Sequence, residues 1–128
     1  MIQEDYISFE TARKLKKKGF LQLVSPWKIG YDKDGNEVDS LSAVAHGGYV
    51  RPALSLVQKW LRDEKHVVID IQPIFFTWKE EIPDHWKLCI YVCPIKNGNT
   101  RKPYDDFDEF NTYEEALSAG INKSLDLI

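Results

Sequence analysis

Cysteine, histidine and methionine are scarce in this chain of 128 residues, which has two, three and one of them. Cys89 and Cys93 lie four residues apart in a predicted strand, so their Cα atoms are roughly 13 Å apart, whereas a disulfide requires less than about 7 Å. The three histidines are scattered and give no zinc-ligand spacing. The sequence therefore predicts two reduced, structural cysteines, no metal and no cofactor.

Long apolar runs are also missing. No stretch approaches the roughly 20 residues of a membrane-spanning helix, and the N-terminus has neither the basic start nor the apolar core of a signal peptide. The length favours a single domain, residues 1–128, large enough to bury a core without a metal or a disulfide. These absences predict a cytoplasmic protein without membrane contact.

Positive charge is in the minority and is unevenly distributed. The net charge is −3, but residues 1–62 carry 10 lysines and arginines against 7 acidic residues, and residues 63–128 carry 7 against 13. An acidic chain is a poor general binder of polyanions. A basic patch in the first half can still meet a phosphate.

The strongest β pattern is an antiparallel hairpin, in which HVVIDIQPIFFTW (66–78) and HWKLCIYVCP (85–94) flank the polar KEEIPD. Strand residues alternate between two faces. One face should meet the helices. It holds Val67, Ile69, Ile71, Trp86, Leu88, Ile90 and Val92. Pro73 cannot donate to a ladder, so the first strand bulges or ends there, and the register of residues 73–78 stays open.

The other face of this hairpin is less polar than a solvated face should be. Its candidate partner-binding residues are Val68, Cys89, Tyr91, Cys93 and Trp78, with Phe76 as a further member. Contiguous exposed apolar patches mark partner surfaces. The alternative is that the first helix or the N-terminal segment covers this face, and the sequence favours neither interpretation.

Three amphipathic helices are predicted. The first begins after Ser8, a good N-cap, and ends at Gly19. The second runs from near Pro52 to about Lys65 and has the strongest apolar stripe, so it is expected to cover the sheet. The third begins with a capping box at Thr112 and runs to the C-terminus.

The first helix presents a basic side that is a candidate anion-binding patch, formed by Arg13, Lys14, Lys17 and Lys18. Lysines late in a helix also suit its negative end and keep an exposed face soluble, which is the simpler interpretation.

Between the first two helices, WKIGY and LSAVA are predicted strands joined by a turn at DKDGN. The spacing of Asp32, Asp34 and Asn36 is not that of a calcium loop, because Gly35 comes early and position 41 is Leu. His46 and the two glycines after it are interpreted as a connecting loop. Residues 105–109 are interpreted as a solvated acidic loop.

These elements predict an α+β fold in a single domain, roughly α-ββ-α-ββ-α, with an antiparallel sheet of about four strands and helices mainly on one face.

Three segments together give a resemblance to a known group: YISFETARKLKKKGF, RPALSLVQKWLRDEKHVVIDI and YEEALSAGINKSLDLI. The chain resembles uncharacterised small α+β proteins encoded by phages, prophages and gut Bacteroides-type genomes. The resemblance implies a mobile-element setting and no known activity.

The leading hypothesis is therefore a non-enzymatic accessory protein that binds another protein, or a second copy of itself, through the second face of the hairpin. A nucleic-acid binder that uses the basic first helix is the alternative. An enzyme with an unrecognised site is the third hypothesis, since His46, Cys89 and the acidic residues 105–109 occur only in isolation.

Overall fold

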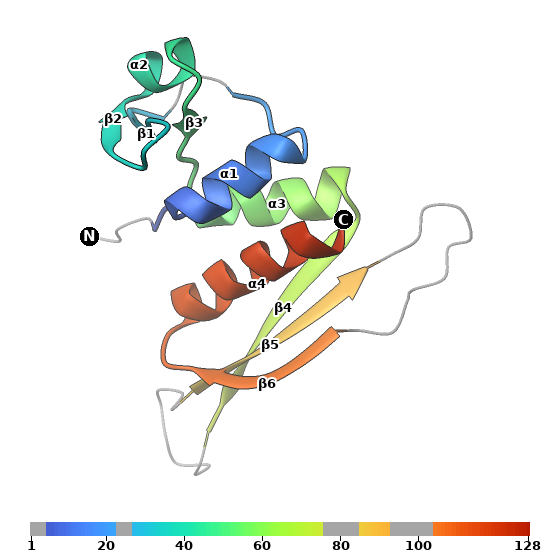
Figure 1. The fold of residues 1–128 in the computed structure, drawn as a ribbon. Coiled ribbons are helices and arrows are strands. Elements are labelled where there is room, and N and C mark those ends of the chain that lie inside the picture. The colour runs from blue at the N-terminus through green and yellow to red at the C-terminus, as the bar shows by residue number, and fades with distance from the viewer. Residues whose placement is uncertain (1–4, 23–26, 76–84, 93–103) are drawn as a thin grey trace. The chain divides into compact units, whose positions relative to one another are not determined.

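The computed structural model describes residues 5–22, 27–75, 85–92 and 104–128. The chain is α+β and divides into two compact units, residues 1–54 and residues 55–128 (Figure 1). Each unit contains an antiparallel sheet of three strands. The prediction of one sheet of about four strands in the order α-ββ-α-ββ-α is thus not confirmed, whereas the α+β class is.

In the first unit, α1 (Phe9–Lys17) begins and ends as the sequence predicts. The Ser8 hydroxyl accepts a hydrogen bond from the Thr11 amide at 3.3 Å. At the other end Gly19 has a φ of +94°, and the amides of Gly19 and Phe20 donate to the carbonyls of Lys16 and Leu15. These two bonds form a Schellman motif, which satisfies carbonyls that the helix leaves without intrahelical donors.

The strands β1 (Ile29–Tyr31) and β2 (Glu37–Asp39) are joined by the predicted DKDGN turn. Asp32 organises the turn, because its Oδ1 accepts hydrogen bonds from the amides of Asp34 and Asn36, each at 2.9 Å. Gly35 adopts a φ of +90°, which is strained for a residue with a Cβ. The turn prediction is confirmed.

The segment predicted as a strand at LSAVA is instead a helix, α2 (Ser40–Ala45). Asp39 ends β2 and also caps this helix, since its carboxylate accepts the Ser42 amide at 2.9 Å. The loop predicted after it is the end of the helix: the Gly48 amide donates to the Ala43 carbonyl at 2.7 Å, and Gly47 has a φ of +75°. The alternating apolar residues of LSAVA look like a strand, but the caps at both ends enforce a helix.

The short strand β3 (Tyr49–Val50) completes the sheet of the first unit, in the order β2-β1-β3. Gly30 and Gly48 allow the backbones of β1 and of the segment that leads into β3 to approach each other closely. A Cβ at Gly30 would lie 2.7 Å from the Tyr49 carbonyl oxygen, and one at Gly48 would lie 2.2 Å from that of Tyr31. The Tyr31 hydroxyl donates to the Ile7 carbonyl at 2.7 Å, and burial raises the pKa of this phenol.

In the second unit, α3 (Leu54–Glu64) confirms the helix predicted from near Pro52 to about Lys65. It is followed by β4 (Val67–Ile74) and β5 (His85–Val92), which pair antiparallel along their whole length. This pairing fixes the register of Pro73 and Ile74 opposite Trp86 and His85. The rest of the uncertain stretch, residues 76–78, lies outside the described residues, as do Cys93 and the KEEIPD connection.

A third strand, β6 (Tyr104–Phe110), lies beside β5 where the sequence predicts an acidic loop. Aspartate disfavours strands, and YDDFDEF has no clear alternation, so local pattern gives no strand signal. The strand forms because β5 supplies a ladder for it. Its register shifts between Lys87 and Leu88, as in a β-bulge.

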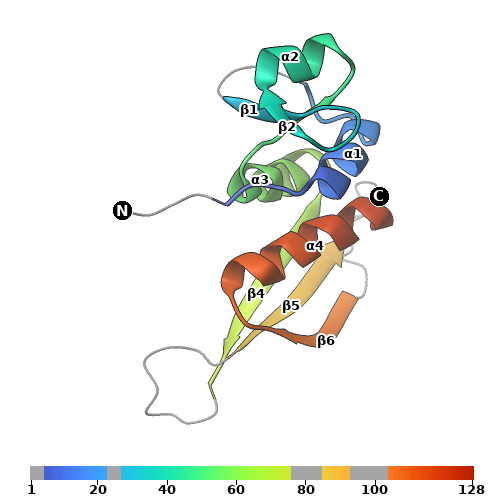
Figure 2. The ribbon, with the colours of Figure 1, turned by 60° about the vertical axis from the view of Figure 1, so that its left-hand side comes forward.

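The helix that packs along all three of these strands is α4 (Tyr113–Leu127), not the second helix as predicted (Figures 1 and 2). Thr112 caps it, accepting the Glu115 amide at 3.1 Å, which confirms the predicted start. Gly120 sits against the sheet, since a Cβ there would lie 2.8 Å from Leu88 Cδ1 and 2.9 Å from Ile69 Cγ2. Leu88 and Ile69 are buried, so the predicted helix-facing side of the hairpin is confirmed for these residues.

Candidate functional site

The face of the β4-β5-β6 sheet opposite α4 carries the residues predicted to bind a partner. Val68 pairs directly with Tyr91, Asp70 with Cys89, and Gln72 with Lys87. Directly paired residues of antiparallel strands point to the same face, and Ile69 and Leu88, one position away, pack on α4. The paired residues that face away from α4, together with Glu109 opposite Lys87, are called the open face below.

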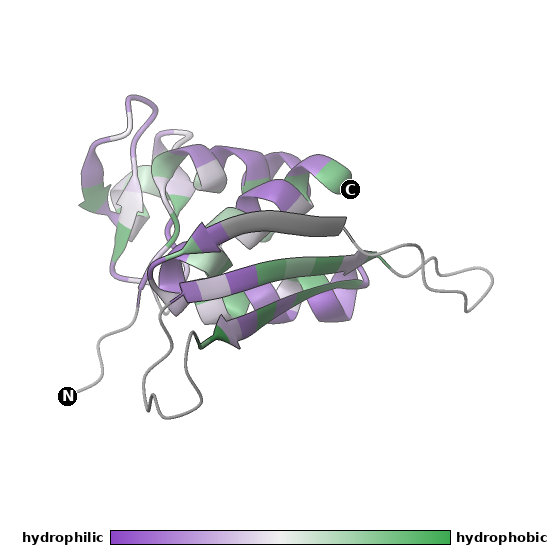
Figure 3. Cartoon of the chain, turned by 90° about the horizontal axis from the view of Figure 1, so that it is seen from below, coloured by the Kyte–Doolittle hydropathy of each residue, from purple (hydrophilic) through white to green (hydrophobic). Residues whose placement is uncertain are grey.

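The described part of unit 2 places both helices on the other side of the sheet. α4 packs along the strands, and Gln58 of α3 donates to the Ile69 carbonyl at 3.3 Å. Figure 3 looks onto the open face, where no described helix or strand of this unit lies in front of the sheet. Among the described residues of unit 2, both helices thus lie on one side of the sheet.

The predicted partner-binding residues differ in accessibility. Val68 is 36 % exposed and Tyr91 is half-buried, so the two form an accessible apolar pair on neighbouring strands. Cys89 is only 6 % exposed and is a thiol outside any disulfide, so it contributes little contact surface. Trp78 and Cys93 lie outside the described residues.

The other end of the open face is polar. His85 Nε2 lies 3.7 Å from Glu109 Oε2, and Gln72 is exposed beside the half-buried Lys87. The three strands together hold five carboxylate residues and one lysine. These residues are divided between the two sides of the sheet, because Asp106 lies opposite Leu88, which packs on α4, whereas Asp105 and Glu109 lie opposite Cys89 and Lys87. Residues 105–109 look like a loop in the sequence, so no local pattern indicates this strand.

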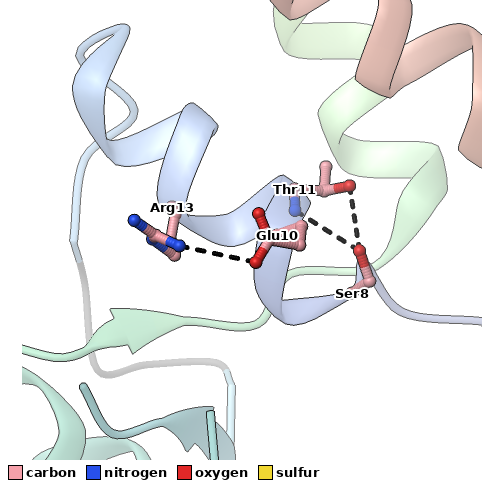
Figure 4. Close-up of polar contacts among 4 residues, drawn as sticks. All are labelled: Ser8, Glu10, Thr11 and Arg13. Carbon is pink, nitrogen blue, oxygen red and sulfur yellow. Dashed lines mark hydrogen bonds and ion pairs between the residues drawn. The ribbon is translucent and has the colours of Figure 1, made fainter. Parts of the chain in front are cut away.

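The second predicted site is the basic side of α1, where Arg13 and Lys17 are exposed and Lys14 and Lys18 are half-buried. Arg13 already has partners within the helix. Its Nη1 lies 3.4 Å from Glu10 Oε1 (Figure 4). Its guanidinium carbon lies 5.7 Å from the centre of the Phe9 ring. An exposed pair of this kind contributes little to stability.

Lys16, which the predicted basic patch leaves out, has a structural role. Its Nζ donates to the Gly48 carbonyl at 3.1 Å and lies 5.1 Å from the centre of the Tyr49 ring. These contacts join α1 to β3. A lysine in a basic run carries no sequence signal for such a role, because the partner carbonyl lies 32 residues away.

His46 stands at the end of α2, where its Nδ1 lies 2.9 Å from the Ser42 carbonyl oxygen. It is exposed, and its contact serves the helix end. In the described ranges, no group of three or more His, Cys, Asp or Glu side chains is placed to hold a metal ion. None of the helices in these ranges has the length and apolarity that a membrane crossing requires.

No protein-family model, curated protein or solved structure matches this chain. The resemblance to phage and Bacteroides-type proteins stays a prediction.

Proposed function

We propose that this chain is a non-enzymatic protein-interaction module that binds another protein chain through the open face of its second unit. The observation that carries the proposal is the exposed Val68 beside Tyr91 on a sheet face that no described helix of its unit covers. Apolar side chains that stand next to each other on an uncovered face gain free energy when a partner removes them from water.

The free energy gained by covering this apolar pair is too small to hold a partner by itself. Val68 is already about two-thirds buried, so its complete burial adds on the order of 1 kcal/mol. Association costs at least about 4 kcal/mol in lost translational and rotational freedom. The Val68–Tyr91 pair is therefore an anchor, and a partner has to reach along the strands toward Gln72 and Lys87 to bind stably.

Site-specific photocrosslinking tests the proposal in the cells that make the protein. A photoreactive phenylalanine at Gln72 lies on the open face, and the same residue at Lys59 is a control on the exposed side of α3. The Gln72 position should give a discrete protein adduct that Lys59 does not give, and Tyr91→Glu should abolish it. Equal adduct patterns from both positions would refute the proposal.

Nucleic-acid binding by α1 is a second candidate, favoured by the exposure of Arg13 and Lys17 on its basic side. Replacing Arg13, Lys14, Lys17 and Lys18 together by Glu should then remove binding to single-stranded oligonucleotides. Phosphate contacts release counterions, so the affinity of the unaltered chain should fall as salt rises. This candidate would be excluded if binding persists after the four substitutions, or if the affinity does not depend on the salt concentration.

A further inference from the structure

We propose that Asp34 is a site of spontaneous modification to isoaspartate, and that the hydrogen bonds of Asp32 keep this site closed in the folded chain. Asp34 lies in the turn between β1 and β2, in the first unit, so the proposal is independent of the open face of the second unit. Both reacting groups belong to the chain itself, and the only other reactant is water.

The reacting groups of the modification are neighbours in the sequence. The backbone nitrogen of Gly35 attacks Cγ of the protonated Asp34 carboxyl group and forms a five-membered succinimide ring. The carboxyl hydroxyl leaves as water together with the amide proton. Water then opens the ring. Cleavage of the new N–Cγ bond restores aspartate, whereas cleavage of the original peptide bond leaves the main chain running through Cγ, as isoaspartate.

The position of Asp34 makes this reaction accessible. Its side chain is exposed, so water reaches the carboxyl group. Glycine at the next position has no Cβ that would hinder the attacking nitrogen. The hydrogen bonds that organise the turn end on the Asp32 carboxylate and do not use the Asp34 carboxylate.

The folded turn holds the attacking nitrogen in place. The Gly35 amide donates to the Asp32 carbonyl at 3.2 Å, which closes a turn of four residues. The Asp34 amide donates to Asp32 Oδ1 at 2.9 Å and fixes the peptide on the other side of Asp34. The nitrogen has to lose its proton and rotate toward Asp34 Cγ before it can attack, so the turn has to open locally first.

The surroundings of the turn show what the modification would change. A Cβ built on Gly35 would lie 3.0 Å from Phe9 Cδ2, so the ring of this α1 residue lies against the glycine. The Asp32 amide donates to the Asn36 carbonyl at 2.9 Å at the base of the turn. Isoaspartate adds one carbon to the main chain between these contacts, so they cannot all re-form with their present geometry.

Mass spectrometry of the full chain tests the proposal. After incubation at neutral pH and proteolysis, fragmentation that distinguishes isoaspartate from aspartate measures the modified fraction at position 34. This fraction should grow severalfold more slowly in the folded chain than in the same chain in urea.

Two variants separate the role of Asp32 from general stability. Asp32→Ala removes the side-chain acceptor of the Asp34 and Asn36 amides and should speed the modification severalfold. Asp39→Ala removes the cap of α2 in the same unit but leaves these bonds in place, so it should not. If Asp32→Ala does not fold, Asp32→Asn replaces it, with a smaller increase expected because an acceptor oxygen remains.

Three results would overturn the proposal. Equal rates in the folded and the urea-unfolded chain would show that the turn does not protect Asp34. Equal acceleration by the Asp32 and Asp39 variants would assign the effect to unfolding of the unit and not to the turn. A chain that forms no isoaspartate at position 34 even in urea would exclude the site.

Discussion

Two positions of the first unit require glycine for different reasons. Gly19 needs a left-handed conformation but has open space around it, with no atom within 4 Å of a built Cβ. Gly48 is restricted by space alone, because a Cβ would lie 2.2 Å from the Tyr31 carbonyl oxygen. Backbone cannot move aside as the end of a flexible side chain can.

Alanine at these two positions should therefore have unequal effects. Gly19→Ala should lower the free energy of unfolding by about 1 kcal/mol, the cost of a left-handed L-residue. Gly48→Ala should lower it by about 3 kcal/mol or more, because the contact exceeds ordinary overpacking. Urea unfolding measures both changes. Equal losses would show that the β1–β3 approach is looser than the structure has it.

The charge of Asp32 makes the stability of the first hairpin's turn depend on pH. The hydrogen bonds that its carboxylate accepts from Asn36, Asp34 and Gly35 hold its pKa below the usual value. A group with a lowered folded-state pKa stabilises the fold above its unfolded pKa, and this contribution is lost as pH falls through the folded one.

Asp32→Asn keeps an acceptor oxygen and removes the charge. We expect the unaltered chain to be the more stable of the two at pH 7, with the difference shrinking below about pH 4, the ordinary range of an aspartate. Thermal melts of both proteins between pH 7 and pH 2 give this difference. A difference in stability between the two proteins that stays constant with pH would contradict the role of the charge.

At the scale of the element, α2 shows how a cap overrides an apolar alternation. The helix has only six residues, so it depends on Asp39 at its start and on Gly47 and Gly48 at its end. Isolated helices of this length do not form in water.

Asp39→Ala should consequently destabilise the first unit by about 1 kcal/mol, the usual cost of losing an N-cap. Asp34→Ala is the matched control, because it removes an exposed carboxylate from the same hairpin without removing a cap. Chemical denaturation distinguishes the two. If Asp34→Ala costs as much as Asp39→Ala, the cap is not what stabilises α2.

For the whole molecule, the small apolar area of the open face predicts the oligomeric state. Burying Val68 beside Tyr91 gains less free energy than association costs, so the chain should elute as a monomer of 14.9 kDa. Light scattering coupled to size exclusion measures this mass at several concentrations and salt levels. A doubled mass that Tyr91→Glu returns to 14.9 kDa would contradict the prediction.

Much of the fold and part of the site follow from sequence pattern because they depend on neighbours in the chain. Ser8, Gly19 and Thr112 bound their helices through bonds that span a few residues. The alternation in β4 and β5 separates Ile69 and Leu88, which pack on α4, from Val68 and Tyr91 on the other side. The apolar end of the open face was thus visible from parity alone.

Only the tertiary structure decides the rest, because its causes lie far apart in the chain. YDDFDEF lacks the alternation that marks a strand, and it becomes β6 because β5 offers a ladder. Lys16 is bound by a carbonyl 32 residues away, and α4, not α3, is the helix that packs along all three strands. The sequence by itself determined the helix caps and the two faces of the hairpin, through local bonds and strand alternation. Pairing between segments far apart in the sequence decided that the hairpin gains β6 as a third strand.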